Sequence, residues 1–204
     1  MSKEKKKTTV TKTEAGSAKK SFWQAAVVGA KLLLICAIVA GVVSFVYALT
    51  AEQYAINMQA TKNEAIGEIF GLSAPKCEAL PAEGLEIEET VFKVYDGDTH
   101  VGYCVEVKSG GFGGDITMMV GYTADCTVLG VEIVSMSETP GLGSKAGEAP
   151  FLSQFAGKTD TLTLGEDVDA ISGATISSKA VTEGVNQAFQ SLQNVLSLNG
   201  GAIR

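Results

Sequence analysis

The spacing of apolar and polar positions divides this chain of 204 residues into a continuous apolar segment, a helical segment and a series of short alternating segments. Residues 25–49 are almost wholly apolar, and they exceed the roughly 20 residues that a helix needs to cross the hydrocarbon core of a bilayer. From residue 90 onward, alternating runs end at turn signals such as Asp96-Gly97-Asp98, a pattern typical of antiparallel strands. The predicted strands are 91–95, 101–107, 115–122 and 126–134.

Helical spacing predicts two further elements. Residues 52–71 carry apolar side chains at helical intervals, which predicts a helix that follows the apolar segment. Residues 178–198 carry one apolar stripe, which we interpret as the core-facing side of a second helix. We also predict a short helical turn at 151–155, a last strand at 161–164 and an acidic, proline-containing connector at 75–89. The expected fold is α+β, with a single N-terminal transmembrane helix followed by a twisted antiparallel sheet packed with helices.

The formal charge of −7 is unevenly distributed. Residues 1–31 carry a net +6 and the remainder carries −13. Because positive residues flank membrane helices on the cytoplasmic side, we expect a cell-membrane protein with a cytoplasmic N-terminus and an extracytoplasmic acidic domain. Lys31 lies near one end of the apolar segment, from where its ammonium group reaches the headgroups. A cleaved signal peptide is the alternative, although the apolar run is longer than is usual for one.

These features predict four parts: a basic cytoplasmic tail at 1–24, a transmembrane helix at 25–49, a membrane-proximal helix with its connector at 50–89, and a folded domain at 90–204. The outer domain is acidic and lacks a basic aromatic face, which argues against nucleic-acid binding. The lone histidine, His100, is expected at the surface in a hairpin turn, and no metal site or catalytic set is predicted. Cys104 and Cys126 are the best-placed pair for a disulfide, although a reducing habitat would leave both free.

Residues 169–178 combine small residues with the start of a helix. Ser172, Gly173 and Ala174 allow the backbone to approach a ligand closely, and the first helical turn offers unpaired N–H groups and the positive end of the helix dipole. This arrangement predicts an anion site, most simply for phosphate, where the hydroxyl of Thr175 touches the phosphate or is esterified to it. Ordinary helix capping by Ser and Thr is the alternative interpretation of the same residues.

The run Ser172-Gly-Ala-Thr175, with Asp169 six residues before its threonine, resembles the flavinylation motif of a known FMN-binding domain. That domain is shared by the G subunit of the Rnf ion-translocating electron-transport complex and the C subunit of the sodium-translocating NADH:quinone reductase. A second segment, Ser-Glu-Thr-Pro-Gly-Leu-Gly at 137–143, resembles the E-T-P-G-L-G signature of the same domain. The resemblance extends loosely over residues 25–198, and the compact outer domain favours the G subunit.

The resemblance implies FMN whose phosphate is esterified to Thr175 by a flavin transferase that uses FAD. No convincing base adjoins the threonine hydroxyl, which argues against self-attachment and agrees with an external transferase. Asp169 matches the acid of the family motif, and the resemblance implies that it serves recognition by that enzyme. An ordinary exposed loop residue is the alternative interpretation of Asp169. Pro140 stiffens the second motif, and its glycines leave a flat backbone surface against which a ring system can lie. We expect ring contacts from Thr139 and Leu142 and a polar contact from Glu138.

The implied function is that of a membrane-anchored electron-transfer subunit, not catalytic alone, in a complex that couples electron flow between reduced ferredoxin and NAD to sodium or proton movement. Its expected partners are the other subunits of an Rnf-type complex, the flavin transferase during maturation, and the lipid bilayer. Two alternatives remain: an anchored non-redox module that binds a ligand or partner, and a flavin carrier of a separate extracellular electron-transfer chain.

Overall fold

The computed structural model describes residues 3–81 and 89–199, and it confirms the α+β fold class. Residues 82–88 of the predicted connector, and the chain ends at 1–2 and 200–204, lie outside the described residues. The chain forms two compact units, residues 1–55 and residues 56–204.

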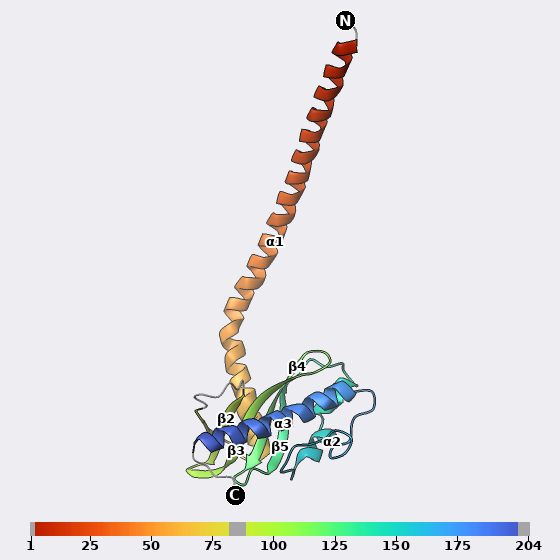
Figure 1. The fold of residues 1–204 in the computed structure, drawn as a ribbon. Helices are drawn as coiled ribbons and strands as arrows, with labels where there is room; N and C mark the ends of the chain where they lie inside the picture. The colour runs from red at the N-terminus through yellow and green to blue at the C-terminus, as the bar shows by residue number, and fades with distance from the viewer. Residues whose placement is uncertain (1–2, 82–88, 200–204) are drawn as a thin grey trace. The chain divides into compact units, whose positions relative to one another are not determined.

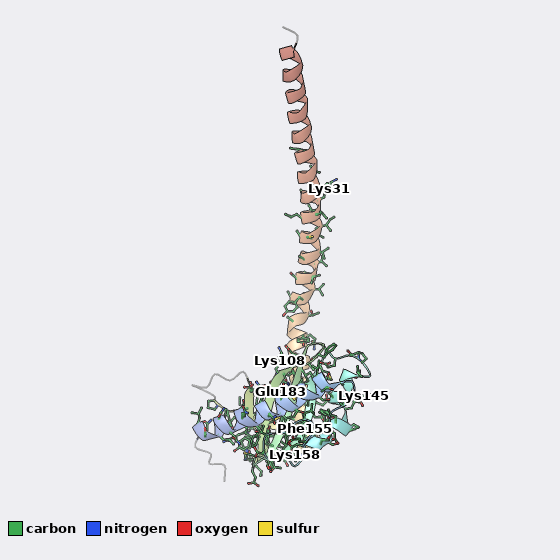
Figure 2. The ribbon with its side chains drawn as sticks, turned by 45° about the vertical axis from the view of Figure 1, so that its right-hand side comes forward. Lys31, Lys108, Lys145, Phe155, Lys158 and Glu183 are labelled. Carbon is green, nitrogen blue, oxygen red and sulfur yellow. The ribbon has the colours of Figure 1, made fainter. Side chains whose placement is uncertain are left out.

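Helix α1 (Lys3–Phe70) supplies the described part of the first unit and continues into the second. Its segment Val27–Ala51, 25 residues, is long and apolar enough to cross a membrane, and Lys31 lies near one end of it (Figure 2). The predicted helices at 25–49 and 52–71 are parts of this one helix, because no proline interrupts the chain between them. Gly71 ends α1 in the left-handed region (φ 66°), and the amide of Leu72 donates to the carbonyl of Gly67 at 2.9 Å.

The second unit is built on a five-stranded antiparallel sheet in the order β1-β2-β3-β4-β5. The four predicted strands are confirmed with slightly different limits. The strand that the sequence did not predict is β1, which lies in the expected connector and pairs with β2 at the sheet edge. The strands are β1 (Lys76–Ala79), β2 (Thr90–Asp96), β3 (Thr99–Gly110), β4 (Asp115–Thr123) and β5 (Val128–Ser135).

Both faces of this sheet are covered. Alternate residues of the central strands face opposite sides, so Met118 and Val120 pack with helix α3 (Thr175–Leu198), whereas Met119 packs with the last turns of α1. Figure 1 shows α3 lying across the strands. An ion pair between Lys62 and Glu106, 2.7 Å long and largely shielded from water, also ties α1 to β3. The predicted apolar stripe of α3 is confirmed as a core-facing surface.

Three glycines on β3, β4 and β5 form a seat for the end of α1. A side chain at Gly121 would collide with Ile69, whereas one at Gly102 would collide first with the backbone carbonyl of Tyr122 on β4 and then with Phe70. A side chain at Gly130 would make only ordinary contact with Ile69. The end of α1 can therefore approach β4 closely because Gly121 carries no Cβ atom, with Gly102 leaving room for Phe70 beside it.

The segment between β5 and α3 contains η1 (Gly143–Gly147), α2 (Ala149–Leu152) and η2 (Ser153–Phe155), which confirms the predicted turn near 151–155. The predicted strand at 161–164 is wrong, since only an isolated bridge joins Leu164 to Val168. The reason lies in Leu162, whose backbone N–H and C=O bond instead to the side-chain amide of Asn186 on α3, at 2.8 and 2.9 Å.

Candidate functional site

The two motifs singled out from the sequence lie together at one cavity of about 260 Å³. One wall is the turn that follows β5, and the other is the loop and first turn of α3. A third segment, the hairpin loop between β3 and β4, contributes Phe112. The lining residues are Phe112, Glu138, Thr139, Leu142, Gly143, Gly173, Ala174, Thr175, Ile176 and Ser177.

Thr175 is the first residue of α3, and its side chain is exposed at the cavity. Ala174 occupies the N-cap position, where no side chain bonds to the first helical amides, and the first turn carries no acidic residue. Gly173 precedes it in the left-handed region (φ 80°). The start of this 24-residue helix therefore presents N–H groups and the positive dipole end beside the Thr175 hydroxyl.

Ser178 holds this loop in place from inside the helix. Its hydroxyl donates to the carbonyl of Ala174 at 3.0 Å and accepts from the amide of Ile171 at 3.1 Å. The amide of Ala174 in turn donates to the carbonyl of Ile171 at 3.0 Å. The position of Thr175 is thus fixed by a buried side chain three residues further along the helix.

Glu138 joins the three walls of the cavity. Its Oε1 accepts from the amides of Phe112 (2.7 Å) and Gly113 (3.2 Å), and its Oε2 accepts from the hydroxyl of Ser177 (2.8 Å). The carboxylate is buried, and a side chain at Gly143 would collide with it. Glu138 therefore organises the site through protein hydrogen bonds, and the polar ligand contact expected of it stays a prediction.

Of the residues predicted from sequence, Glu138, Thr139, Leu142, Gly173, Ala174 and Thr175 line the cavity. Ser172 is exposed one residue outside this lining. Asp169 is also exposed, and its backbone amide donates to the side-chain oxygen of Gln154 at 2.8 Å. Their contacts with a ligand stay predictions.

The sequence reasoning missed Phe112, Ile176 and Ser177. The signal for Phe112 was the run Gly110-Gly-Phe-Gly-Gly114, in which a single aromatic residue stands among glycines. Ser177 gave no separate signal, because serine is common at the start of any helix.

Cys104 and Cys126, the pair that the sequence placed best for a disulfide, are both free thiols. Cys104 lies in the core beneath α1, whereas Cys126 packs in the core beneath α3, so the two side chains face opposite sides of the sheet. Burial raises the pKa of the Cys104 thiol, and the nearby Cys77 raises it further, which keeps that thiol protonated and unreactive.

His100 does not lie in an exposed hairpin turn as the sequence predicted. It is half-buried on β3 opposite Tyr95, and its ring meets those of Tyr95 and Tyr103 edge-on, with centroids 5.7 and 4.8 Å away. Within the described residues, no group of three or more His, Cys, Asp or Glu side chains is placed to hold a metal ion.

Residues 111–190 match the family model described as an FMN-binding domain, and all the residues that line the cavity lie within this range. The G subunit of the Na(+)-translocating ferredoxin:NAD(+) oxidoreductase complex of Acetobacterium woodii is 34% identical over 193 residues, which cover 82% of this chain and 91% of that protein. The G subunit of the ion-translocating oxidoreductase complex of Methanosarcina acetivorans is 32% identical over 77% of this chain and 88% of its own length. The chain therefore belongs to the family of G subunits of these ion-translocating oxidoreductase complexes, and it is a membrane protein.

Among solved structures, the crystal structure of Shewanella oneidensis NqrC aligns with a TM-score of 0.45 and 24% identity, over 61% of this chain and 69% of that chain.

The residues at the cavity fit FMN. Phe112, Leu142 and Ile176 supply apolar surface for a ring system, and the uncapped first turn of α3 supplies N–H groups for a phosphate. Gly173 leaves the loop without a side chain at the point where Leu142 approaches it. A site with apolar walls and a few placed polar groups is the usual form of a cofactor site.

Proposed function

We propose that this protein carries FMN as a phosphoester on Thr175 and serves as the electron-carrying subunit of an Rnf-type ferredoxin:NAD oxidoreductase complex. The observation that supports this most directly is the placement of the exposed Thr175 side chain. It stands at the positive end of α3, on the cavity to which both sequence motifs contribute.

The attachment is a group transfer from FAD. The Oγ1 atom of Thr175 attacks the FMN-side phosphorus, an Oγ1–P bond forms, the pyrophosphate P–O bond breaks, and AMP leaves. The hydroxyl proton passes to a base of the flavin transferase, because the cavity's own carboxylate, Glu138, is buried and already accepts three hydrogen bonds. The uncapped amides of α3 stabilise the phosphoester.

Bound FMN supplies one- and two-electron redox chemistry. The chain's contribution is to hold that group on a rigid helix start and to keep it at the membrane through α1. Covalent attachment prevents the flavin from dissociating from a cavity whose lining is partly exposed to solvent. We further propose that the basic N-terminal segment lies in the cytoplasm and the second unit outside it, as the positive-inside rule predicts.

The test of attachment is the intact mass of the full chain extracted from membranes of cells that contain the flavin transferase. Wild type should gain the mass of one FMN less one water, and Thr175→Val, which removes the hydroxyl at nearly constant volume, should gain nothing. Thr161→Val is the matched control, because Thr161 is also exposed but does not line the cavity, so this variant should leave the mass gain intact. An unmodified wild-type chain would refute the covalent proposal and favour a non-redox binding module.

Membership of a complex has its own test. Affinity purification of the full chain in mild detergent should recover multi-span membrane subunits in stoichiometric amounts. Recovery of the flavin-loaded chain alone would instead favour a carrier in a separate extracellular electron-transfer chain.

A further inference from the structure

The cavity is bordered by a group of exposed apolar side chains. Phe112 is 69% exposed, Ile176 is 55% exposed and Leu142 is 44% exposed, and all three line the cavity. Large apolar side chains are stabilised when they are buried, so a cluster of them exposed around one cavity indicates a surface that binds another group. The other large apolar side chains exposed in the described part of the second unit lie elsewhere: Ile56, Leu129 and Leu198.

The loop that carries Phe112 is built to hold this one side chain in place. A side chain at Gly111 would collide with Glu138, and a side chain at Gly113 would collide with the carbonyl of Ser137. The amide of Gly111 closes the turn by donating to the carbonyl of Gly114 at 2.9 Å, and Glu138 accepts from the next two amides. The backbone is therefore pressed against the segment 137–138, and Phe112 is the single side chain that this glycine turn presents.

We propose that Phe112 is a positioning residue that covers the flavin, with its ring stacked on the isoalloxazine of the FMN held by Thr175. The inference rests on the proposed function. Leu142 and Ile176 complete an apolar collar around the same ring system. Offset stacking between aromatic rings stabilises such a contact beyond the area that it buries.

The attachment point at Thr175 indicates which group these apolar side chains contact. Ile176 directly follows Thr175 in the chain, and Leu142, on the opposite wall, lies close to Gly173 two residues before Thr175. A flavin attached at Thr175 is held at a high effective concentration beside these side chains, which a separate partner protein would not be. The collar therefore fits a flat aromatic group attached at the helix start better than it fits a docking protein.

Flavin fluorescence of the full, FMN-loaded chain in detergent tests the proposal. An indole ring in contact with a flavin quenches its emission by electron transfer, so Phe112→Trp should lower the emission several-fold. Leu129→Trp is the matched control, because Leu129 is 40% exposed on β5 and does not line the cavity. The flavin emission of Leu129→Trp should differ from that of wild type by no more than about 10%. Phe112→Ala should raise the quenching constant for added iodide at least two-fold, because one face of the flavin loses its cover.

The intact mass is measured on each variant, which separates the two proposals. Absence of FMN mass from wild type would refute the proposed function itself. A normal mass gain, with Phe112→Trp emission equal to that of Leu129→Trp and unchanged iodide quenching in Phe112→Ala, would overturn the role of Phe112 alone. Loss of co-purifying subunits from these variants, with flavin emission unchanged, would overturn it also and would assign the collar to a protein partner.

Discussion

Replacing Glu138 with alanine should loosen all three walls of the cavity at once. The change leaves two backbone amides and the buried Ser177 hydroxyl without their acceptor. An unsatisfied buried polar group costs about 1–3 kcal/mol, but the amides of Phe112 and Gly113 lie in a surface loop where water can replace the carboxylate. We therefore expect a net loss of about 3 kcal/mol in the free energy of unfolding. For a chain of this size that corresponds to a fall of about 6–12 °C in Tm.

Glu138→Gln is the matched control. Its amide oxygen can still accept from the two loop amides, and its NH2 group can donate to the hydroxyl of Ser177, so we expect a loss of only about 1 kcal/mol. The assay is calorimetric unfolding of the full chain in detergent, combined with the intact mass to measure FMN loading. If the alanine and glutamine variants unfold within about 1 °C of each other, Glu138 does not join the walls as argued.

Three further changes probe other parts of the second unit. Gly121→Ala should lower the free energy of unfolding by about 1–3 kcal/mol because its Cβ collides with the end of α1, whereas Gly110→Ala, which meets nothing, should be close to neutral by the same calorimetry. Burial and the nearby Glu68 raise the pKa of Glu132 above its ordinary value, so the folded state holds this proton more tightly and stability falls as pH rises through the interval between the unfolded and folded pKa values. Glu132→Gln should flatten that part of a Tm-against-pH curve, and an unchanged slope would contradict the assignment. Ser178→Ala should cost about 1 kcal/mol and reduce the fraction of chain that carries FMN mass, and full loading would show that the loop before α3 is held without its hydroxyl.

The parts of the fold that the sequence predicted are those with a local signal. The stripe on α3 and the hairpins of β2 to β5 repeat at helical or strand intervals, so neighbouring residues suffice to identify them. Strand β1 has only the four residues Lys-Cys-Glu-Ala and is specified by its pairing with β2, which no local pattern records.

The candidate site divides in the same way. Thr175 and the turn at 139–143 were predicted because small residues and a helix start lie close in sequence. Phe112 and the three bonds of Glu138 depend on segments brought together from β3–β4, β5 and α3, so their roles required the tertiary structure. Cys104 and Cys126 were the best-placed pair only by adjacency along the meander, which does not fix which face of the sheet a side chain occupies, and the structure places them in the cores on opposite faces.

The glycine seat for α1 has a consequence for the order in which the protein is made. Ile69 and Phe70 pack over strands that the ribosome synthesises only after the whole helix has been completed. Until β5 exists, the last turns of α1 have no surface on which to bury these side chains, while the apolar segment before them is already able to enter a bilayer. A chain whose synthesis stops between α1 and β5 would therefore be anchored in the membrane while the apolar end of α1 stays exposed. Chaperones and proteases recognise such exposed apolar surface.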